Sequence, residues 1–312
     1  LFAFAATTNA VSDHHFDQLF DAYLDDDSVR AFVEQTNSHA LAEMAARLRE
    51  AIDRAGITGA DVQNVVIGTV VPTQPKDAYV SRVAAVNAGI PTDAPAMNVN
   101  RLCGSGLQAI VSAAQAIALG EHDVAVAGGA ESMSNAPHMV LSARNGQKMG
   151  NIEMVDAMLG ALHDPFENIH MGVTAENVAE RCGISREEQD AVAVESHKRA
   201  AAAIAAGYFK EQIVPVEIKT RKGVTIFDTD EHVRADASLE GMGGLRPVFK
   251  KDGTVTAGNP SGINDGAGAV VLASGKAVAE KGLKPLARII AWGHAGVEPS
   301  VMGLGPVKAV PV

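Results

Sequence analysis

The segment Ala96-Met-Asn-Val-Asn-Arg-Leu-Cys-Gly-Ser-Gly-Leu-Gln-Ala-Ile110 joins two secondary-structure elements through a turn. Residues 96–99 form a short extended run, and from Leu107 to Leu119 the apolar residues recur at helical spacing. The glycines on either side of Ser105 give the backbone room for a tight turn. The segment therefore predicts that Cys103 lies at, or just before, the N-terminus of a buried helix.

A cysteine in this position is chemically favoured as a nucleophile. Unpaired backbone N–H groups and the positive end of the helix dipole converge at a helix N-terminus, and both favour the reactive thiolate form. We predict that Cys103 carries an acyl group. The alternative for any cysteine is a buried structural role. Cys182, at a helix end without a partner motif, fits that alternative.

The same letters also fit a dinucleotide-binding pattern. Residues Gly104 to Ala109 match G-x-G-x-x-A, and the acidic residues Glu121 and Asp123 follow at a tolerable distance. In that pattern the first glycine normally follows an apolar strand directly, whereas polar residues and Cys103 intervene here. The segment therefore favours a nucleophilic cysteine over a nicotinamide-binding site.

The flanking sequence predicts an α/β fold with a mainly parallel sheet. A β-α-β-α-β series is built from a strand within 61–71, a helix at 78–89, the 96–119 unit and a strand at 123–127. From about 132 to 250 the alternation stops, and one strong helix begins at the capping box Ser185-Arg-Glu-Glu188. A strand is expected again at 268–273, and another at 286–291.

Composition excludes several classes of function. The formal net charge of −11 argues against nucleic acid as a partner, and no apolar run approaches the ~20 residues of a membrane span. No signal peptide is visible, and two cysteines give neither disulfide nor zinc spacing, so we expect a cytoplasmic protein. His14-His15 and residues 25–27 lack a third ligand at suitable spacing, so we expect no metal site there.

Four ordered motifs resemble the thiolase family of acetyl-CoA acyltransferases. They are Asn-Arg-Leu-Cys103-Gly-Ser-Gly, Gly128-Gly-Ala-Glu-Ser-Met133, His170-Met-Gly-Val-Thr-Ala-Glu-Asn177 and Gly253-Thr-Val-Thr-Ala-Gly-Asn-Pro-Ser261-Gly-Ile-Asn-Asp-Gly266. The resemblance runs from about residue 55 to 312. It implies a layered α/β/α fold, with a mixed sheet rich in parallel strands and an inserted loop domain at about 132–250.

The resemblance also implies chemistry and site residues. Cys103 would carry the acyl group of a coenzyme A thioester, which is a substrate, and no permanently bound cofactor is implied. The substrate would be bound by His170, Met171, Arg234, Ser261 and Met302, with Lys219–Lys222 as a further cationic segment. Homologues of this kind form homodimers or homotetramers. The family's Gly-His-Pro motif and second reactive cysteine have no counterpart in these 312 residues, so we expect no turnover by this chain alone.

The first 54 residues carry a second resemblance, to the C-terminus of a cobaltochelatase large subunit. We therefore expect three parts: a foreign helical segment at 1–54, a thiolase N-terminal domain at 55–275, and the start of a truncated C-terminal domain at 276–312. Three alternatives stay open. They are a non-catalytic chimeric fragment that keeps only a dimerisation surface, a ketoacyl synthase-like condensing enzyme, and a chelatase subunit.

Overall fold

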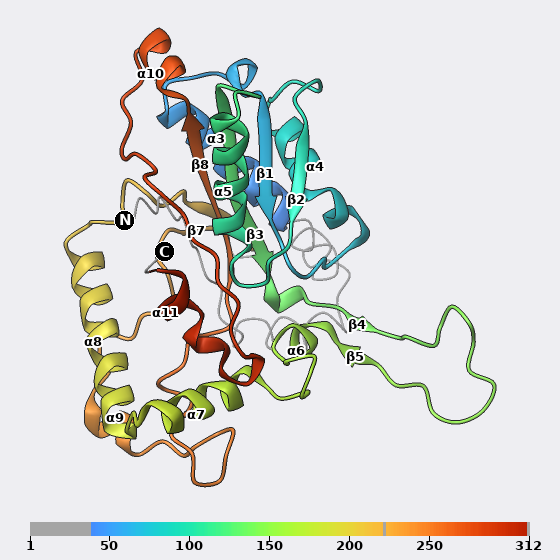
Figure 1. Cartoon of the computed structure of the whole chain (residues 1–312), viewed down its shortest axis with the longest axis vertical. Helices are drawn as coiled ribbons and strands as arrows, with labels where there is room; N and C mark the ends of the chain where they lie inside the picture. Colours follow the sequence, from blue (N-terminus) through green and yellow to red (C-terminus); the bar gives the residue numbers. More distant parts are fainter. Residues whose placement is uncertain (1–38, 221–222, 311–312) are drawn as a thin grey trace. The chain divides into compact units, whose positions relative to one another are not determined.

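The computed structural model describes residues 39–220 and 223–310, which form two compact units (Figure 1). The described part of the first unit comprises residues 39–139, 212–220, 223–231 and 263–288, and that of the second comprises 140–211, 232–262 and 289–310. The second unit overlaps the stretch that we expected to be an inserted domain at 132–250. It differs in leaving out 212–231 and in including residues from 289 onward.

A four-stranded mixed sheet organises the first unit. Its strands are β1 (Asn64–Gly68), β2 (Ala96–Val99), β3 (Val124–Ser132) and β8 (Asp265–Ala273), in the order β2-β1-β3-β8. β1 is parallel to both β2 and β3, whereas β8 is antiparallel to β3, from Val124 opposite Ala273 to Ser132 opposite Asp265. The predicted α/β fold with a sheet rich in parallel strands is confirmed.

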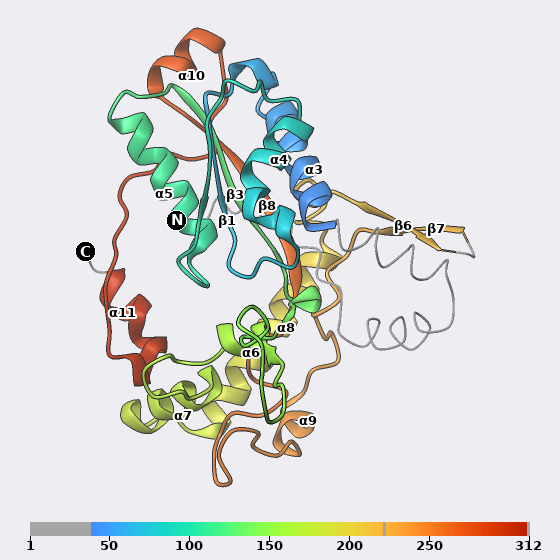
Figure 2. The ribbon, with the colours of Figure 1, turned by 90° about the vertical axis from the view of Figure 1, so that its right-hand side faces the viewer.

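Helices cover both faces of this sheet, as Figure 2 shows. α3 (His39–Arg54) and α4 (Val80–Asn87) lie on one face, and α5 (Ser105–Ala118) lies on the other. α4 ends as predicted, because Gly89 adopts a positive φ of 85° that ordinary side chains disfavour. The shorter elements are η1 (Gly59–Asp61), η2 (Pro75–Tyr79), η3 (Met133–Asn135), β4 (His138–Met139), α10 (Gly275–Lys281) and the hairpin of β6 (Val216–Thr220) and β7 (Gly223–Phe227).

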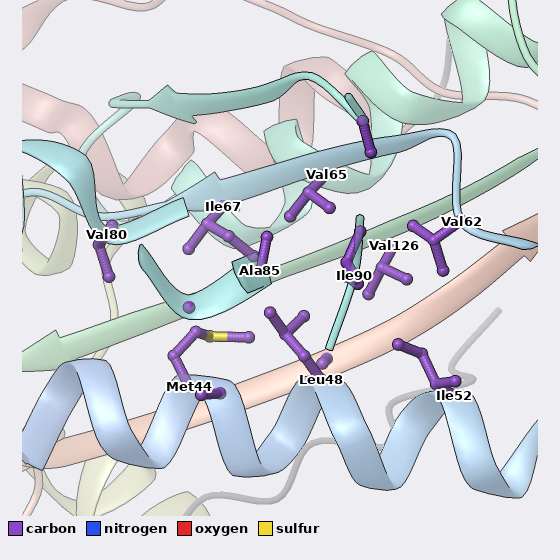
Figure 3. Packing of buried hydrophobic residues seen from close by; sticks show 14 of the residues in the cluster. Met44, Leu48, Ile52, Val62, Val65, Ile67, Val80, Ala85, Ile90 and Val126 are labelled. Carbon is purple, nitrogen blue, oxygen red and sulfur yellow. The ribbon is translucent and has the colours of Figure 1, made fainter. Parts of the chain in front are cut away.

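The larger hydrophobic core lies between the sheet and the α3–α4 face. Met44, Leu48 and Ile52 project from α3 at intervals of one helical turn (Figure 3). They join a buried cluster with residues of β1 and β3, among them Val65 and Val126. α3 is further tied to the unit by Arg49 and Arg54, which donate hydrogen bonds to the carbonyls of Asn87 and Gln212.

The position of α3 differs from the expected organisation of the N-terminal part. We placed residues 1–54 in a separate helical segment, yet α3 shares one core with the sheet, because its apolar stripe is the surface that closes this face. Residues 1–38, including His14-His15 and 25–27, lie outside the described residues. The resemblance of this part to a cobaltochelatase stays a prediction.

Helices dominate the second unit. They are α6 (Ala157–Ala161), α7 (Met171–Cys182), α8 (Arg186–Ala205), α9 (Leu239–Gly243), η4 (Pro299–Leu304) and α11 (Gly305–Ala309), with the short strand β5 (Val155–Asp156). α8 begins as predicted, because the hydroxyl of Ser185 accepts a hydrogen bond from the N–H of Glu188 and the Glu188 carboxylate accepts one from the N–H of Ser185.

The strand that we expected at residues 286–291 is not formed. Leu286 and Ile290 are exposed, and these residues have extended but irregular backbone. A strand is stable only when a neighbour pairs with its N–H and C=O groups, and no strand of the described chain does so here. Among residues 39–220 and 223–310, no helix has both the length and the apolar character needed to cross a bilayer.

Candidate functional site

Cys103 lies in the turn between β2 and α5, where the sequence places it. Its side chain is exposed, and α5 begins two residues later, at Ser105. The turn contains one unusual backbone conformation, because Leu102 has a φ of 45°. A residue with a Cβ rarely adopts this left-handed region, which costs about 1–2 kcal/mol. The conformation immediately before the cysteine must therefore be held by its surroundings.

Two polar side chains hold the backbone of Leu102. The Oδ1 atom of Asn100 accepts a hydrogen bond from the Leu102 N–H at 2.9 Å. The hydroxyl of Ser105 donates to the Leu102 carbonyl oxygen at 2.6 Å and accepts from the N–H of Arg101 at 2.9 Å. The Ser105 N–H donates to the same Leu102 carbonyl at 2.9 Å. Both polar groups of the Leu102 backbone are thereby engaged.

Glycines near the turn serve close packing rather than the turn itself. Neither Gly104 nor Gly106 has a positive φ, which differs from our expectation that they open the turn. A Cβ on Gly68, at the end of β1, would instead lie only 2.6 Å from the backbone nitrogen of Gly106. Similarly, a Cβ on Gly129 would lie 3.4 Å from the Cα of Gly106. The start of α5 therefore rests directly on the backbones of β1 and β3.

A half-buried carboxylate fixes the loop beside the turn. Glu131, on β3, accepts hydrogen bonds from the N–H groups of Val70 at 2.8 Å and Val71 at 3.0 Å. The Val70 carbonyl in turn accepts a hydrogen bond from the Asn100 side chain at 3.3 Å. Burial raises the pKa of Glu131, the two N–H groups oppose that rise, and the nearby charge of Asp265 adds to it. Hydrogen bonds thus lead from β3 through this loop to the cysteine turn.

A second group of predicted residues surrounds the N-terminus of α7 in the other unit. His170 caps this helix, and its Nδ1 atom accepts a hydrogen bond from the Gly172 N–H at 3.0 Å. Its ring stacks on Phe249, with ring centroids 4.7 Å apart, and meets the ring of His163 edge-on at 5.2 Å. Burial, and then the charge of His163, lower the pKa of His170. The neutral imidazole is favoured, and Met171 follows it as the first residue of the helix.

Polar side chains of α7 anchor the segments that carry Met302 and Ser261. The Asn177 amide donates to the carbonyl of Ser300 at 2.9 Å, which holds η4 and therefore Met302 against α7. The buried carboxylate of Glu176 accepts hydrogen bonds from the N–H groups of Thr254 and Val255. This fixes the beginning of the loop that leads to Ser261, an exposed residue.

Arg234 belongs to a small group of basic residues in the same unit. Its N–H donates a hydrogen bond to the Nδ1 atom of His197 at 3.2 Å, and the rings of His197 and His232 lie 5.8 Å apart. Burial lowers the pKa of His197, and the positive charges of His232 and Arg234 lower it further. The Arg234 side chain is exposed. The other predicted cations, at 219–222, lie outside the described side chains.

The predicted site residues therefore fall into two groups, one in each unit. Cys103 belongs to the first unit, whereas His170, Met171, Arg234, Ser261 and Met302 belong to the second. The sequence alone did not reveal the supporting residues Asn100, Ser105, Glu131, Glu176 and Phe249. All except Phe249 stand inside the four quoted motifs, which was the available signal. Their roles depend on partners that sequence order does not reveal.

Comparison with known proteins decides the family. The model of the thiolase N-terminal domain matches residues 27–276. The chain belongs to the thiolase family. Its match to the beta-ketothiolase BktB of Cupriavidus necator has 62% identity over 266 residues, covering 85% of this chain and 68% of that protein. The chain thus spans about two thirds of the length of this thiolase.

Solved thiolase structures agree with this assignment. Human mitochondrial 3-ketoacyl-CoA thiolase superposes with a TM-score of 0.85 at 43% identity, covering 87% of this chain and 69% of that one. A structure of the human protein in complex with CoA gives a TM-score of 0.83 at 42% identity, covering 87% and 68%. The family match begins at residue 27, so it includes all of α3 and extends beyond the start at about residue 55 that we expected.

Proposed function

We propose that this thiolase-family chain accepts an acyl group from a coenzyme A thioester onto Cys103. The Cys103 thiol gives up its proton to solvent, the thiolate sulfur attacks the thioester carbonyl carbon, and the carbon–sulfur bond to coenzyme A breaks. The coenzyme A thiolate leaves and takes a proton from solvent. In the family reaction this acyl group joins a second acyl-CoA to give a 3-oxoacyl-CoA, or the reaction runs in reverse. We place the chain in this acyltransferase class without assigning an acyl-chain length.

The observation that carries the proposal is the position of Cys103 at the start of α5. The residue is exposed, so a thioester has access to it, and the positive end of the α5 dipole favours negative charge nearby. The same helix end suits the oxyanion that forms when a thiolate adds to a thioester carbonyl. Cys182, by contrast, lies at the C-terminal end of α7, which is the negative end of that helix dipole.

We propose that the second unit binds the coenzyme A portion. Arg234 would bind a phosphate, because its exposed guanidinium offers the fork of donors that phosphate prefers, in a chain with a net charge of −11. His170 and Met171, with Met302, would line the acyl and pantetheine portion. The hydroxyl of Ser261 would bind a pantetheine amide. These roles rest on family membership, together with the anchoring of the segments of Met302 and Ser261 on α7 and of Arg234 on His197 of α8.

Intact mass after incubation with acetyl-CoA tests the proposal. We expect the wild-type chain to gain one acetyl group and the Cys103→Ser variant to gain none. The Cys182→Ser variant, which removes the other exposed thiol, is the matched control and should be acetylated like the wild type. An adduct that survives in Cys103→Ser but vanishes in Cys182→Ser would refute the assignment. So would a folded wild-type chain that stays unmodified.

For these 312 residues taken alone, we propose acylation without turnover. The family reaction needs a histidine and a second cysteine from motifs that these residues do not contain, and both move protons in the later steps. A steady-state thiolysis assay that shows many product molecules per chain would contradict this proposal.

We also propose a cytoplasmic homodimer or homotetramer. Light scattering at the mass of a monomer would contradict the proposed oligomeric state.

A further inference from the structure

We propose that Asn100 and Ser105 are positioning residues that keep Leu102 in its left-handed conformation and thereby aim Cys103. The proposal rests on the proposed function of Cys103 as the acyl carrier. Neither side chain needs to touch the substrate. Each acts through the backbone of the residue that precedes the nucleophile.

The first argument is that packing does not hold Leu102. Its side chain is 53% exposed, so burial of the leucine does not balance the unfavourable φ of 45°. Its backbone N–H and C=O are instead both bonded, to Asn100 Oδ1 and to the Ser105 hydroxyl. If these bonds were lost, Leu102 would relax to a negative φ, and the direction of the next residue, Cys103, would change.

The second argument is that each of the two side chains is itself fixed to the sheet. Ser105 is buried, and its backbone touches β1 so closely that Gly68 has no room for a Cβ. Asn100 also donates to the Val70 carbonyl, and the N–H of Val70 donates to the half-buried carboxylate of Glu131. The turn is therefore positioned from two sides, by the end of β1 and by the carboxylate on β3.

The Ser105 hydroxyl also has a double function that alanine cannot replace. It accepts from the Arg101 N–H while it donates to the Leu102 carbonyl, so it bridges the two peptide groups before the cysteine. Removing it leaves the Arg101 N–H without this acceptor and leaves the Ser105 N–H as the remaining partner of the Leu102 carbonyl. We expect the turn to shift rather than the protein to unfold, because the turn is at the surface and the Cys103 side chain is exposed.

Alkylation by iodoacetamide tests this proposal without relying on acetyl-CoA. The rate at Cys103 is measured by peptide mass spectrometry, with Cys182 in the same molecule as the internal reference. We expect Ser105→Ala and Asn100→Ala each to lower the ratio of the Cys103 rate to the Cys182 rate by about fivefold, the size of a lost interaction with a helix N-terminus. Ser112→Ala is the matched control. It removes a hydroxyl from the same helix, one that accepts a hydrogen bond from the Gln108 side-chain amide at 2.9 Å, and should leave the ratio unchanged.

A rescue variant separates positioning from a general structural effect. Glycine adopts positive φ readily, so adding Leu102→Gly to Ser105→Ala should restore most of the Cys103 reactivity. Wild-type ratios in both single variants would overturn the proposal, as would a double variant that stays as slow as Ser105→Ala. Circular dichroism checks that each variant is folded. If the ratios change as expected while wild-type acetylation fails, the positioning role stands and the acyl-carrier function does not.

Discussion

Replacement of Leu48 by alanine tests whether α3 belongs to the core of the first unit. Leu48 has no exposed surface and lies between Met44 and Ile52 on the face that packs against β1 and β3 (Figure 3). Burying one leucine stabilises a protein by about 1.5–3 kcal/mol. The cavity that alanine leaves raises the cost of Leu→Ala to about 2.7–5 kcal/mol in well-packed cores.

We expect a loss of about 3–4 kcal/mol in the free energy of unfolding. The flexible side chain of Met44 can fill part of the cavity, which keeps the cost below the upper end of the range. Urea unfolding followed by circular dichroism gives the total effect. Hydrogen exchange of peptides from β1 and β3 then shows whether the loss is in the sheet that α3 covers.

Two further variants make this test decisive. Asp53→Ala changes an exposed residue of the same helix and should alter the stability by no more than about 0.5 kcal/mol. Leu48→Met nearly preserves volume and should cost less than about 1.5 kcal/mol, which provides a measurable variant if Leu48→Ala does not fold. A Leu48→Ala chain as stable as Asp53→Ala, with unchanged exchange in β1 and β3, would refute the placement of α3 in this core.

Three other predictions concern the cysteine turn and pH. Gly68→Ala should destabilise the protein and slow acetylation of Cys103, because the added Cβ meets the backbone of α5. At Gly106 an added Cβ meets open space, so Gly106→Ala should be neutral or stabilising by up to about 1 kcal/mol. Urea unfolding of both variants checks this. Burial lowers the pKa of His170 below its ordinary value of 6.5. Its contribution to stability is therefore present above that pH and is lost as the pH falls below it. His170→Asn should flatten the pH dependence of unfolding from pH 7 to 5, and an unchanged slope would contradict this. Hydrogen bonding by Lys281 is the main reason that the pKa of Asp61 falls to about 2, so stability should be lost as the pH falls from ~4 to ~2. Lys281→Met should reduce that loss by up to about 1 kcal/mol in acid unfolding curves. An unaltered acid transition would argue against the pair.

Local sequence patterns predicted most of the elements around the candidate nucleophile. The strand predicted within 61–71, the strand at 96–99 and the helix after Cys103 all appear in the structure, the first of them as the shorter β1, which ends at Gly68. These predictions succeeded because a continuous apolar run and a helical repeat are properties of neighbouring residues. For the same reason the capping box at Ser185 was visible in four consecutive letters.

Predictions that needed a distant partner were less complete. The stretch at 286–291 has the composition of a strand, but strand formation depends on a paired neighbour, and none is present in the described chain. The apolar stripe of α3 is equally visible in the letters. Its packing against β1 and β3, and hence its place in the first unit, depends on residues that lie up to 86 positions from Met44, at Ala130.

The sequence by itself determined that this is a thiolase-type α/β chain with a nucleophilic candidate, Cys103, at the start of a helix. It did so because motif order and hydrophobic spacing are written along the chain. Only the tertiary structure decided how that cysteine is held. Leu102, rather than a glycine, has the positive φ, while Gly68 allows the backbones of β1 and α5 to touch. Glu131 supports the turn across 61 residues of sequence, because folding alone brings the N–H of Val70 within reach of its half-buried carboxylate.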